Sequence, residues 1–165
     1  MPRKHLAAIT AVLLLIAQAC TKPAPSQPPK PAPTERIASL AGTSQTILQK
    51  TFTLNSSTTF PFEIPAHAMQ PHLHGIFETF LGKPHGPSDD RANVDFMILN
   101  EEQEGALESN RAADALFSAD PSHNQAVNLD LPPSMNQPVK YYIVFRNPDG
   151  VKTSKSVNAN FRVDF

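Results

Sequence analysis

The chain has 165 residues, a formal net charge of −1, 17 prolines, ten phenylalanines, no tryptophan and a single cysteine. The balanced charge, with no basic stripe, argues against nucleic-acid binding, and one cysteine excludes a disulfide within the chain. The length suits one globular domain with a sizeable core, preceded by shorter segments of different composition.

Residues 1–19 have the layout of a secretory signal peptide. Arg3 and Lys4 form a basic start, and residues 6–17 are apolar apart from one threonine. As a helix this run spans about 18 Å, too short for a bilayer core of roughly 30 Å. Ala19 supplies the small residue expected before a cleavage site. We therefore expect residues 1–19 to direct export and then to be removed.

The only cysteine, Cys20, stands where the apolar run ends. A cysteine directly after the cleavage site resembles the lipobox of bacterial lipoproteins, although Ala17 and Gln18 stand where that family prefers leucine and a small residue. The resemblance implies that Cys20 becomes the acylated first residue and anchors the protein in the bacterial cell envelope. Thr21, rather than aspartate, implies the periplasmic face of the outer membrane. The alternative is an ordinary signal peptide with a chance cysteine.

Residues 20–36 are predicted to be a tether. Six prolines and no large apolar residue lie between Thr21 and Arg36, and proline removes backbone donors, so no helix or sheet is expected. Extended, this tract reaches about 50 Å. Residues 37–165 then have the composition of a single domain, with nine basic and fourteen acidic side chains and no cysteine.

Alternation of apolar and polar residues predicts strands with one wet face. Pro61 indicates that its strand lies at a sheet edge or contains a bulge. The last strand is the clearest, and we expect Phe161, Val163 and Phe165 to be buried. The alternating runs are 49–54, 58–64, 126–131 and 156–165.

Two further runs, 94–99 and 141–145, are apolar at nearly every position and predict central strands covered on both faces. Residues 73–81 predict another strand, with Gly75 at a bulge. The glutamate-rich stretch 101–116 predicts one short helix. Turn signals separate the strands at 82–90, 120–124, 132–138 and 147–150. Seven or eight strands spaced in this way predict an all-β fold, an antiparallel β-sandwich with one short helix.

The order of four segments in the second half resembles the GOLD (Golgi dynamics) β-sandwich. They are "VDFMILNEEQEGAL", "AVNLDLPP", "YYIVFRNPDG" and "SKSVNANFRVDF". The resemblance covers about residues 46–165 and departs at the histidine-rich strand 72–74 and the long loop 83–93. It implies a binding module rather than an enzyme, with a protein or a small ligand as partner, and it supplies no catalytic residue to carry over.

The stretch "HAMQPHLHG" suggests metal chemistry. His72 and His74 lie two positions apart, so on a strand both imidazoles point to one side and form a candidate zinc or copper pair. His67 and His85 are the candidates for a third ligand, and Met69 offers a soft sulfur for copper. The competing interpretation, which we favour, is that these are surface histidines on an edge strand, and no cofactor is expected.

Other polar groups give weaker signals. Asp89, Asp90 and Asp95 are candidate calcium ligands, but the spacing of a calcium loop is missing, which favours a solvated loop. No nucleophile motif or phosphate-binding glycine loop is present. The leading interpretation is a membrane-tethered, non-enzymatic binding or scaffolding module. A metal-handling lipoprotein is its main rival, and a hydrolase is a third alternative.

Overall fold

A computed structural model of the protein describes residues 42–109, 111 and 114–165. The predictions on Cys20, on residues 1–19 and on the tether therefore lie outside the described residues. Within the described residues there are eight strands: β1 (Ser44–Leu54), β2 (Ser57–Ile64), β3 (His72–Leu81), β4 (Val94–Asn100), β5 (Phe117–Ser122), β6 (Asn124–Asp130), β7 (Val139–Arg146) and β8 (Lys155–Asp164). One α-helix, α1 (Glu101–Glu108), and two short 3-10 helices, η1 (Asp90–Ala92) and η2 (Gly150–Lys152), complete it.

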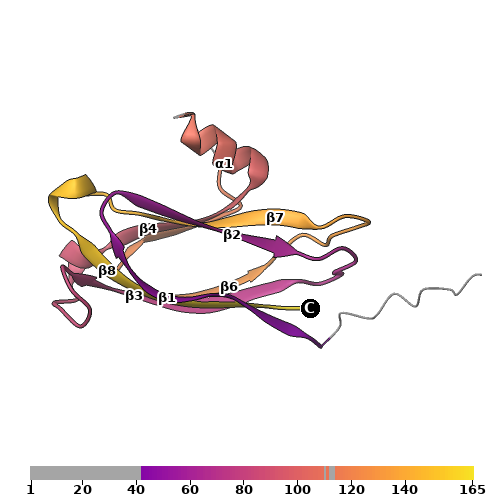
Figure 1. The fold of residues 1–165 in the computed structure, drawn as a ribbon, viewed down its shortest axis with the longest axis horizontal. Helices are drawn as coiled ribbons and strands as arrows, with labels where there is room; N and C mark the ends of the chain where they lie inside the picture. The colour runs from indigo at the N-terminus through magenta and orange to yellow at the C-terminus, as the bar shows by residue number, and fades with distance from the viewer. Residues whose placement is uncertain (1–41, 110, 112–113) are drawn as a thin grey trace, which may run out of the picture. The chain divides into compact units, whose positions relative to one another are not determined.

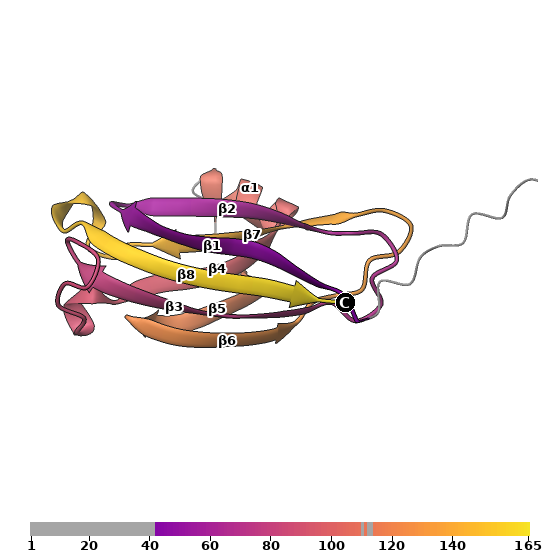
Figure 2. The same ribbon diagram turned by 60° about the horizontal axis from the view of Figure 1, so that its bottom comes forward.

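The strands form two antiparallel sheets that face each other, as Figure 1 shows. One sheet has the strand order β1-β8-β3-β6 and the other the order β2-β7-β4-β5. Successive strands lie in different sheets, apart from β4 and β5, which are neighbours in one sheet. Figure 2 shows the first sheet with β8 between β1 and β3. The predicted antiparallel β-sandwich is confirmed.

Strand β8 follows its sequence pattern closely. Val157, Phe161 and Val163 are fully buried, while the alternate positions from Asn158 to Asp164 are exposed. Phe165 lies just beyond the strand and is half-buried, so its predicted burial is only partial. Because β8 pairs with β1 on one side and β3 on the other, the alternating run lies in the interior of its sheet.

Phenylalanine rings fill the space between the sheets. The Phe96 ring stacks on that of Phe161 with centroids 5.3 Å apart, and on that of Phe77 at 5.2 Å. Phe145 meets the Phe96 ring edge-on at 5.2 Å. Stacked and edge-on aromatic pairs contribute beyond the apolar area that they bury. Contacts across both sheets therefore hold the core together without tryptophan.

The two uniformly apolar strands, β4 and β7, are the inner strands of their sheet. Their outward residues Leu99 and Val144 are as buried as their core-facing ones, and α1 lies over this outer face (Figure 1). Asn100 caps α1 through a capping box with Gln103, in which each side chain accepts from the other residue's backbone N–H. The predicted central position of both strands is confirmed, whereas their outer face is covered only in part, because Met97 and Tyr142 there are half-buried.

Three local predictions are wrong. Gly75 is not at a bulge, because β3 keeps an unbroken register with both neighbours; instead a Cβ there would lie 2.4 Å from the Asn160 carbonyl oxygen. The turn predicted at 120–124 is largely strand β5, which tolerates Pro121 because it is an edge strand. His72 and His74 lie on β3, an interior strand and not an edge. Pro61, in contrast, lies on the edge strand β2, as predicted.

Candidate functional site

The two ends of the sandwich carry different polar groups. The first, called here the histidine end, holds the start of β3, the ends of β6 and β8, and the loops 65–71 and 131–138. The second, the lysine end, holds the loops 82–93 and 147–154 and the start of β8. Of the residues predicted as zinc or copper ligands, all except His85 belong to the histidine end.

His72 and His74 lie side by side on the outer face of their sheet, with ring centroids 6.1 Å apart, which confirms that they share a face. His72 Nδ1 lies 2.6 Å from Asp130 Oδ1 on β6, and its Nε2 lies 2.5 Å from Asn128 Oδ1. His74 Nε2 lies 3.2 Å from Asp164 Oδ2, although this enclosed nitrogen has no well-directed hydrogen bond. The pair therefore links β3 to both neighbouring strands.

The partners of His72 favour its charged form. Hydrogen bonds to Asp130 and then to Asn128 raise the pKa of His72 above its usual value of 6.5. Two oxygen acceptors are both satisfied only when both ring nitrogens carry protons. A metal ligand needs a free nitrogen lone pair, so His72 is poorly placed to bind a metal while these contacts last.

The other two predicted histidines do not join this pair. His67 and His85 both adopt left-handed backbone conformations, with φ of 65° and 60°. The His85 ring packs on Phe80, near the opposite end of β3 from His72. Among the residues that the structure describes, no group of three or more histidine, cysteine, aspartate or glutamate side chains is arranged to hold a metal ion. The structure does not assemble the predicted three-histidine site.

Two loops at the histidine end are tied together by a buried serine. Ser134 is 1% exposed; its hydroxyl accepts from the Ala68 N–H at 2.9 Å and donates to the Pro65 carbonyl oxygen. Its own N–H donates to the Ala68 carbonyl oxygen at 2.9 Å, and the His67 N–H donates to that of Met135 at 2.8 Å. The loops 65–71 and 131–138 therefore form one unit, named here the methionine platform.

The methionine platform presents apolar side chains to solvent. Met69 is 72% exposed and Met135 is 71% exposed. Beside them lies a pocket of about 480 Å³, lined by Met69, Gln70, Pro71, His72, Asp130 and Leu131. Methionine is flexible and polarizable, and exposed methionines are common on surfaces that bind partners. Rigid loops with exposed methionines beside a polar pocket have the features of a binding surface.

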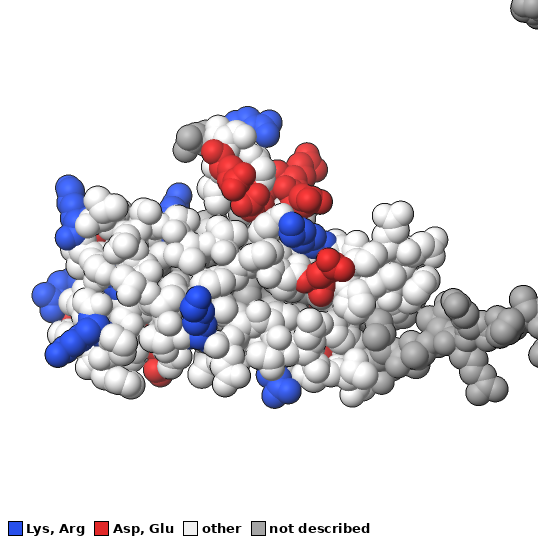
Figure 3. Space-filling model, in the orientation of Figure 1, with Lys and Arg blue, Asp and Glu red and all other residues white. Residues whose placement is uncertain are grey.

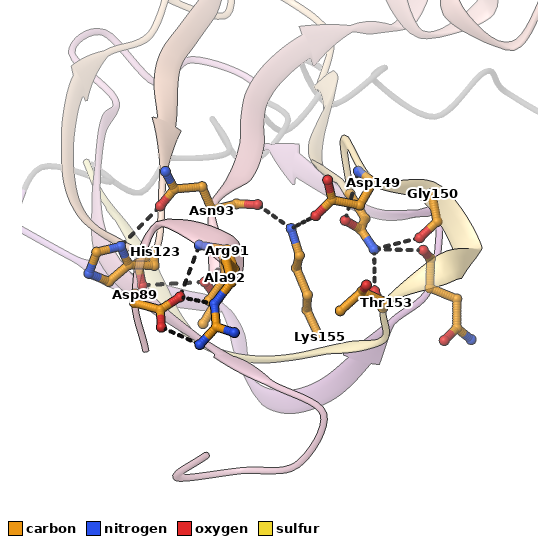
Figure 4. Close-up of polar contacts among 12 residues, drawn as sticks. Asp89, Arg91, Ala92, Asn93, His123, Asp149, Gly150, Thr153 and Lys155 are labelled. Carbon is orange, nitrogen blue, oxygen red and sulfur yellow. Dashed lines mark hydrogen bonds and ion pairs between the residues drawn. The ribbon is translucent and has the colours of Figure 1, made fainter. Parts of the chain in front are cut away.

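The lysine end holds a buried cation, drawn in Figure 4. The Lys155 side chain is 1% exposed, and its Nζ donates to the Asn93 carbonyl oxygen at 2.6 Å and lies 3.0 Å from Asp149 Oδ2. Nearby, Asn147 Nδ2 lies within 2.9 Å of the carbonyl oxygens of Asn55, Gly150 and Thr153. These contacts, named here the lysine network, fasten three loops together, which is a structural role.

The acidic residues considered for calcium are dispersed. Asp89 caps η1 and pairs with Arg91 at 2.7 Å, while Asp95 pairs with Arg146 at 2.8 Å on the other sheet. Two of the three carboxylates therefore have their own cation, while Asp90 begins η1, and the solvated-loop interpretation fits better. Figure 3 shows a separate group of acidic side chains on α1, whose glutamates are Glu101, Glu102, Glu104 and Glu108. There, burial and the nearby Glu108 carboxylate raise the pKa of Glu104.

The sequence interpretation missed the residues that organise both ends. Ser134 and Lys155 lie within a turn signal and a strand, and neither type stands out among many serines and lysines. Lys155 sits at an inward position of the alternating β8 pattern, two residues before Val157, and that register was the available signal. Met135 is joined to His67 only by a contact between distant loops, which no local pattern reveals.

No protein-family model and no curated protein matches the chain. Several solved structures are similar to the chain, and two of them are described here. TmCBM61, determined in complex with β-1,4-galactotriose, is 9% identical, with a TM-score of 0.39 over 68% of this chain and 67% of its own. Aeromonas hydrophila PliG, a periplasmic inhibitor of g-type lysozyme, is 18% identical, with a TM-score of 0.39 over 76% of this chain and 89% of its own. At these values neither likeness carries an argument about function.

Proposed function

We propose that the protein is a lipid-anchored, non-enzymatic binding module of the bacterial cell envelope, and that the methionine platform is its binding surface. One observation carries the binding proposal. Ser134 fixes two distant loops to each other, while Met69 and Met135 on those loops stay exposed. Loops of this kind, held on a rigid sheet scaffold, commonly carry binding function.

The surroundings of the methionines indicate the chemistry of the partner. Met69 lines the same pocket as His72 and Asp130, so an apolar contact and a polar contact lie side by side. The Asp130 side chain is 93% exposed and offers its carboxylate to a donor. A protein segment or small ligand that combines an apolar group with a hydrogen-bond donor fits this arrangement.

The anchoring part of the proposal rests on the sequence. Cys20 at the end of the signal-like run, followed by the proline-rich tether, supports acylation at this thiol. None of the helices within the described residues is long and apolar enough to cross a membrane. Labelling cells with an alkyne fatty acid tests the anchor: label on the wild-type chain should be lost in Cys20→Ala. Equal labelling of the two chains would exclude acylation at Cys20.

The non-enzymatic part is supported by how the buried polar groups are used. Lys155 and Ser134 bind backbone groups, and Lys155 also pairs with Asp149. These contacts fix loops rather than place a nucleophile beside a base. A broad hydrolase substrate screen of the purified protein tests this part, and turnover above background would overturn it.

Photo-crosslinking tests the binding surface directly. A photoreactive phenylalanine analogue placed at Met69 or Met135 should give a discrete crosslinked species in intact cells. The matched control is Val151 in η2, which is 78% exposed but belongs to the lysine end. The same species from Val151, or none from either methionine position, would contradict the proposal.

A copper-handling role is the second candidate. One contact favours methionine ligands over the histidine pair that the sequence suggested. The His67–Met135 backbone hydrogen bond brings a second thioether to the loop that holds Met69. Thioethers and imidazole suit Cu(I). Competition with a chromophoric Cu(I) chelator tests this role. Affinity lost in Met69→Ser/Met135→Ser but kept in His72→Ala would support it, and an unchanged affinity in the double methionine variant would exclude it.

A further inference from the structure

The free edges of the two sheets are not equally protected against pairing with another strand. Edge strands offer unpaired N–H and C=O groups, and proteins protect them with proline, lysine or bulges. Pro61 protects β2, and Pro121 together with a register shift protects β5. Strand β1 has a register shift and carries Lys50, whose Nζ lies over the Phe60 ring at 6.0 Å.

Strand β6 has none of these devices. Its sequence, NQAVNLD, contains no proline, lysine or arginine, and it pairs with β3 without a register shift. Within the described residues it is the only edge strand that is both regular and free of such protection. It is therefore the strand best suited to accept another.

The hydrogen-bond pattern shows which backbone N–H and C=O groups of β6 point away from β3. The Leu131 N–H donates to the Pro71 carbonyl oxygen, and the Thr79 N–H donates to that of His123. Because the direction alternates along an antiparallel strand, the odd-numbered residues of β6 face β3. The even-numbered residues, 124 to 130, therefore turn their N–H and C=O groups toward the free edge. Two of these carbonyl oxygens also accept from side chains: that of Asn124 from the Ser122 hydroxyl at 3.1 Å, and that of Ala126 from the Gln125 amide at 3.2 Å. The side chains of the even-numbered residues lie on the outer face of the sheet.

We propose that β6 pairs antiparallel with β6 of a second copy of this chain, centred on Val127. This register overlaps the whole strand and matches every free donor of one copy with an acceptor of the other. Ala126 then lies opposite Asn128 of the second copy, and Asn124 lies opposite its Asp130. The only charge on β6 meets no like charge, and His72 already neutralises it at 2.6 Å.

Apolar side chains along the same side of the sandwich favour a second copy as the occupant. Leu129 on β6 and Phe117 and Ala119 on β5 pack against the core but are only half-buried. A two-fold axis through the β6 edge brings the same three side chains of the second copy to face them. Self-complementary contacts of this kind are typical of symmetric dimers.

Cysteine pairing in cells tests the register. In the full-length variant Ala126→Cys/Asn128→Cys, the thiol at position 126 of each copy lies opposite the thiol at position 128 of the other copy. Both pairs of thiols are close enough to form a disulfide. Under oxidising conditions it should run as a covalent dimer on non-reducing gels. The control Gln49→Cys/Thr51→Cys has the same spacing on the outer face of β1. Dimers from both variants, from neither, or a bond from β6 to a different protein would each overturn the proposal.

Introducing charges at the paired positions tests the pairing without a covalent bond. In Ala126→Asp/Asn128→Asp, carboxylates face each other at both pairs, whereas in Ala126→Lys/Asn128→Asp each lysine faces an aspartate. Sedimentation of the full-length chain in detergent should show the first variant dimerising at least about tenfold more weakly than the second. Both variants share the Asn128→Asp change, so a side-chain oxygen still faces His72 in each. Equal dimerisation by two chains with the same melting temperature would contradict β6 pairing.

Discussion

The two ends of the sandwich use their polar residues in opposite ways. At the lysine end the Lys155 side chain is 1% exposed and contacts Asn93 and Asp149. At the histidine end the His72 side chain is 37% exposed, and those of Met69 and Met135 are mostly exposed. The first arrangement fastens loops together. The second leaves side chains available above loops that Ser134 already fixes.

Because of this difference, we expect substitutions at the two ends of the domain to affect different properties. A buried cation that loses its partner, or a partner that loses its cation, is costly because water cannot replace the lost contact. An exposed methionine contributes little to folding because its surface stays in water. Substitutions at the lysine end should therefore act mainly on stability, and those at the methionine platform mainly on binding.

The largest expected effect is at Lys155. Lys155→Met keeps the length of the side chain but leaves the Asn93 carbonyl oxygen without a donor and Asp149 without its cation. The free energy of unfolding, measured by urea denaturation, should fall by about 3 kcal/mol. Asp149→Asn keeps a side-chain oxygen that can accept from Lys155 Nζ, and this position is 53% exposed, so the variant should cost less than about 1 kcal/mol. A loss under about 0.5 kcal/mol in Lys155→Met would remove the structural role of the lysine network.

A smaller loss is expected at Ser134. Ser134→Ala leaves the Ala68 N–H buried without its acceptor, which should lower the free energy of unfolding by about 1–2 kcal/mol. Faster amide exchange in the loops 65–71 and 131–138 should accompany it. Ser57→Ala, at an exposed position of β2, is the control and should stay within about 0.5 kcal/mol. Unchanged exchange in both loops would show that Ser134 does not tie them.

A still smaller, pH-dependent effect is expected from His72. Its folded pKa lies above 6.5, so its stabilising contribution is fully present below that value and is lost as the pH rises through the folded pKa. The ring is more than a third exposed, so the contribution should stay below about 1 kcal/mol. Melting curves between about pH 5 and 9 should show a loss of stability in wild type that His72→Gln lacks. Parallel pH profiles would contradict the charged His72–Asp130 contact.

The Asp164 carboxylate acts in a different pH range and does not mask this effect. A hydrogen bond from Ser44, with the nearby His74, lowers its pKa below the usual range. Its contribution is therefore present at neutral pH and is lost only as the pH falls through that lowered pKa. Restricting the melting curves to about pH 5 and above isolates His72.

The smallest expected effect on stability is at the methionine platform. Met69→Ser/Met135→Ser changes two side chains that are mostly in water, so the free energy of unfolding should change by less than about 0.5 kcal/mol. With the photoreactive group placed at Gln70, which lines the pocket, the same double variant should no longer give the crosslinked species expected from the methionine platform. A large loss of stability would show that the methionines are part of the core.

Much of the fold could be predicted from the sequence because burial imposes a period of two on each strand. Strand β8 shows this directly, since each inward residue from Val157 to Val163 was identified by alternation. Strand β5 escaped detection because its pattern is interrupted by Pro121, which only an edge position allows. Gly75 was misplaced because the close approach of β8 comes from another part of the chain.

The candidate site could be predicted less well, for a related reason. Alternation placed His72 and His74 on one face, but their acceptors Asp130 and Asp164 come from strands distant in sequence. The pairing of those strands gives His72 two hydrogen-bond partners and places a carboxylate beside His74. Ser134 acts in the same way across two loops, so its role depends on tertiary contacts alone.

Methionine oxidation tests the central claim most directly, because the proposed binding surface carries its own probes. Met69 and Met135 should oxidise rapidly in the purified protein, since thioethers react according to exposure. In intact envelopes, where a partner covers the platform, both should oxidise several-fold more slowly. The half-buried Met97 on β4 is the internal reference and should keep the same rate in both settings. Equal rates for Met69 and Met135 in purified protein and in envelopes would contradict the account.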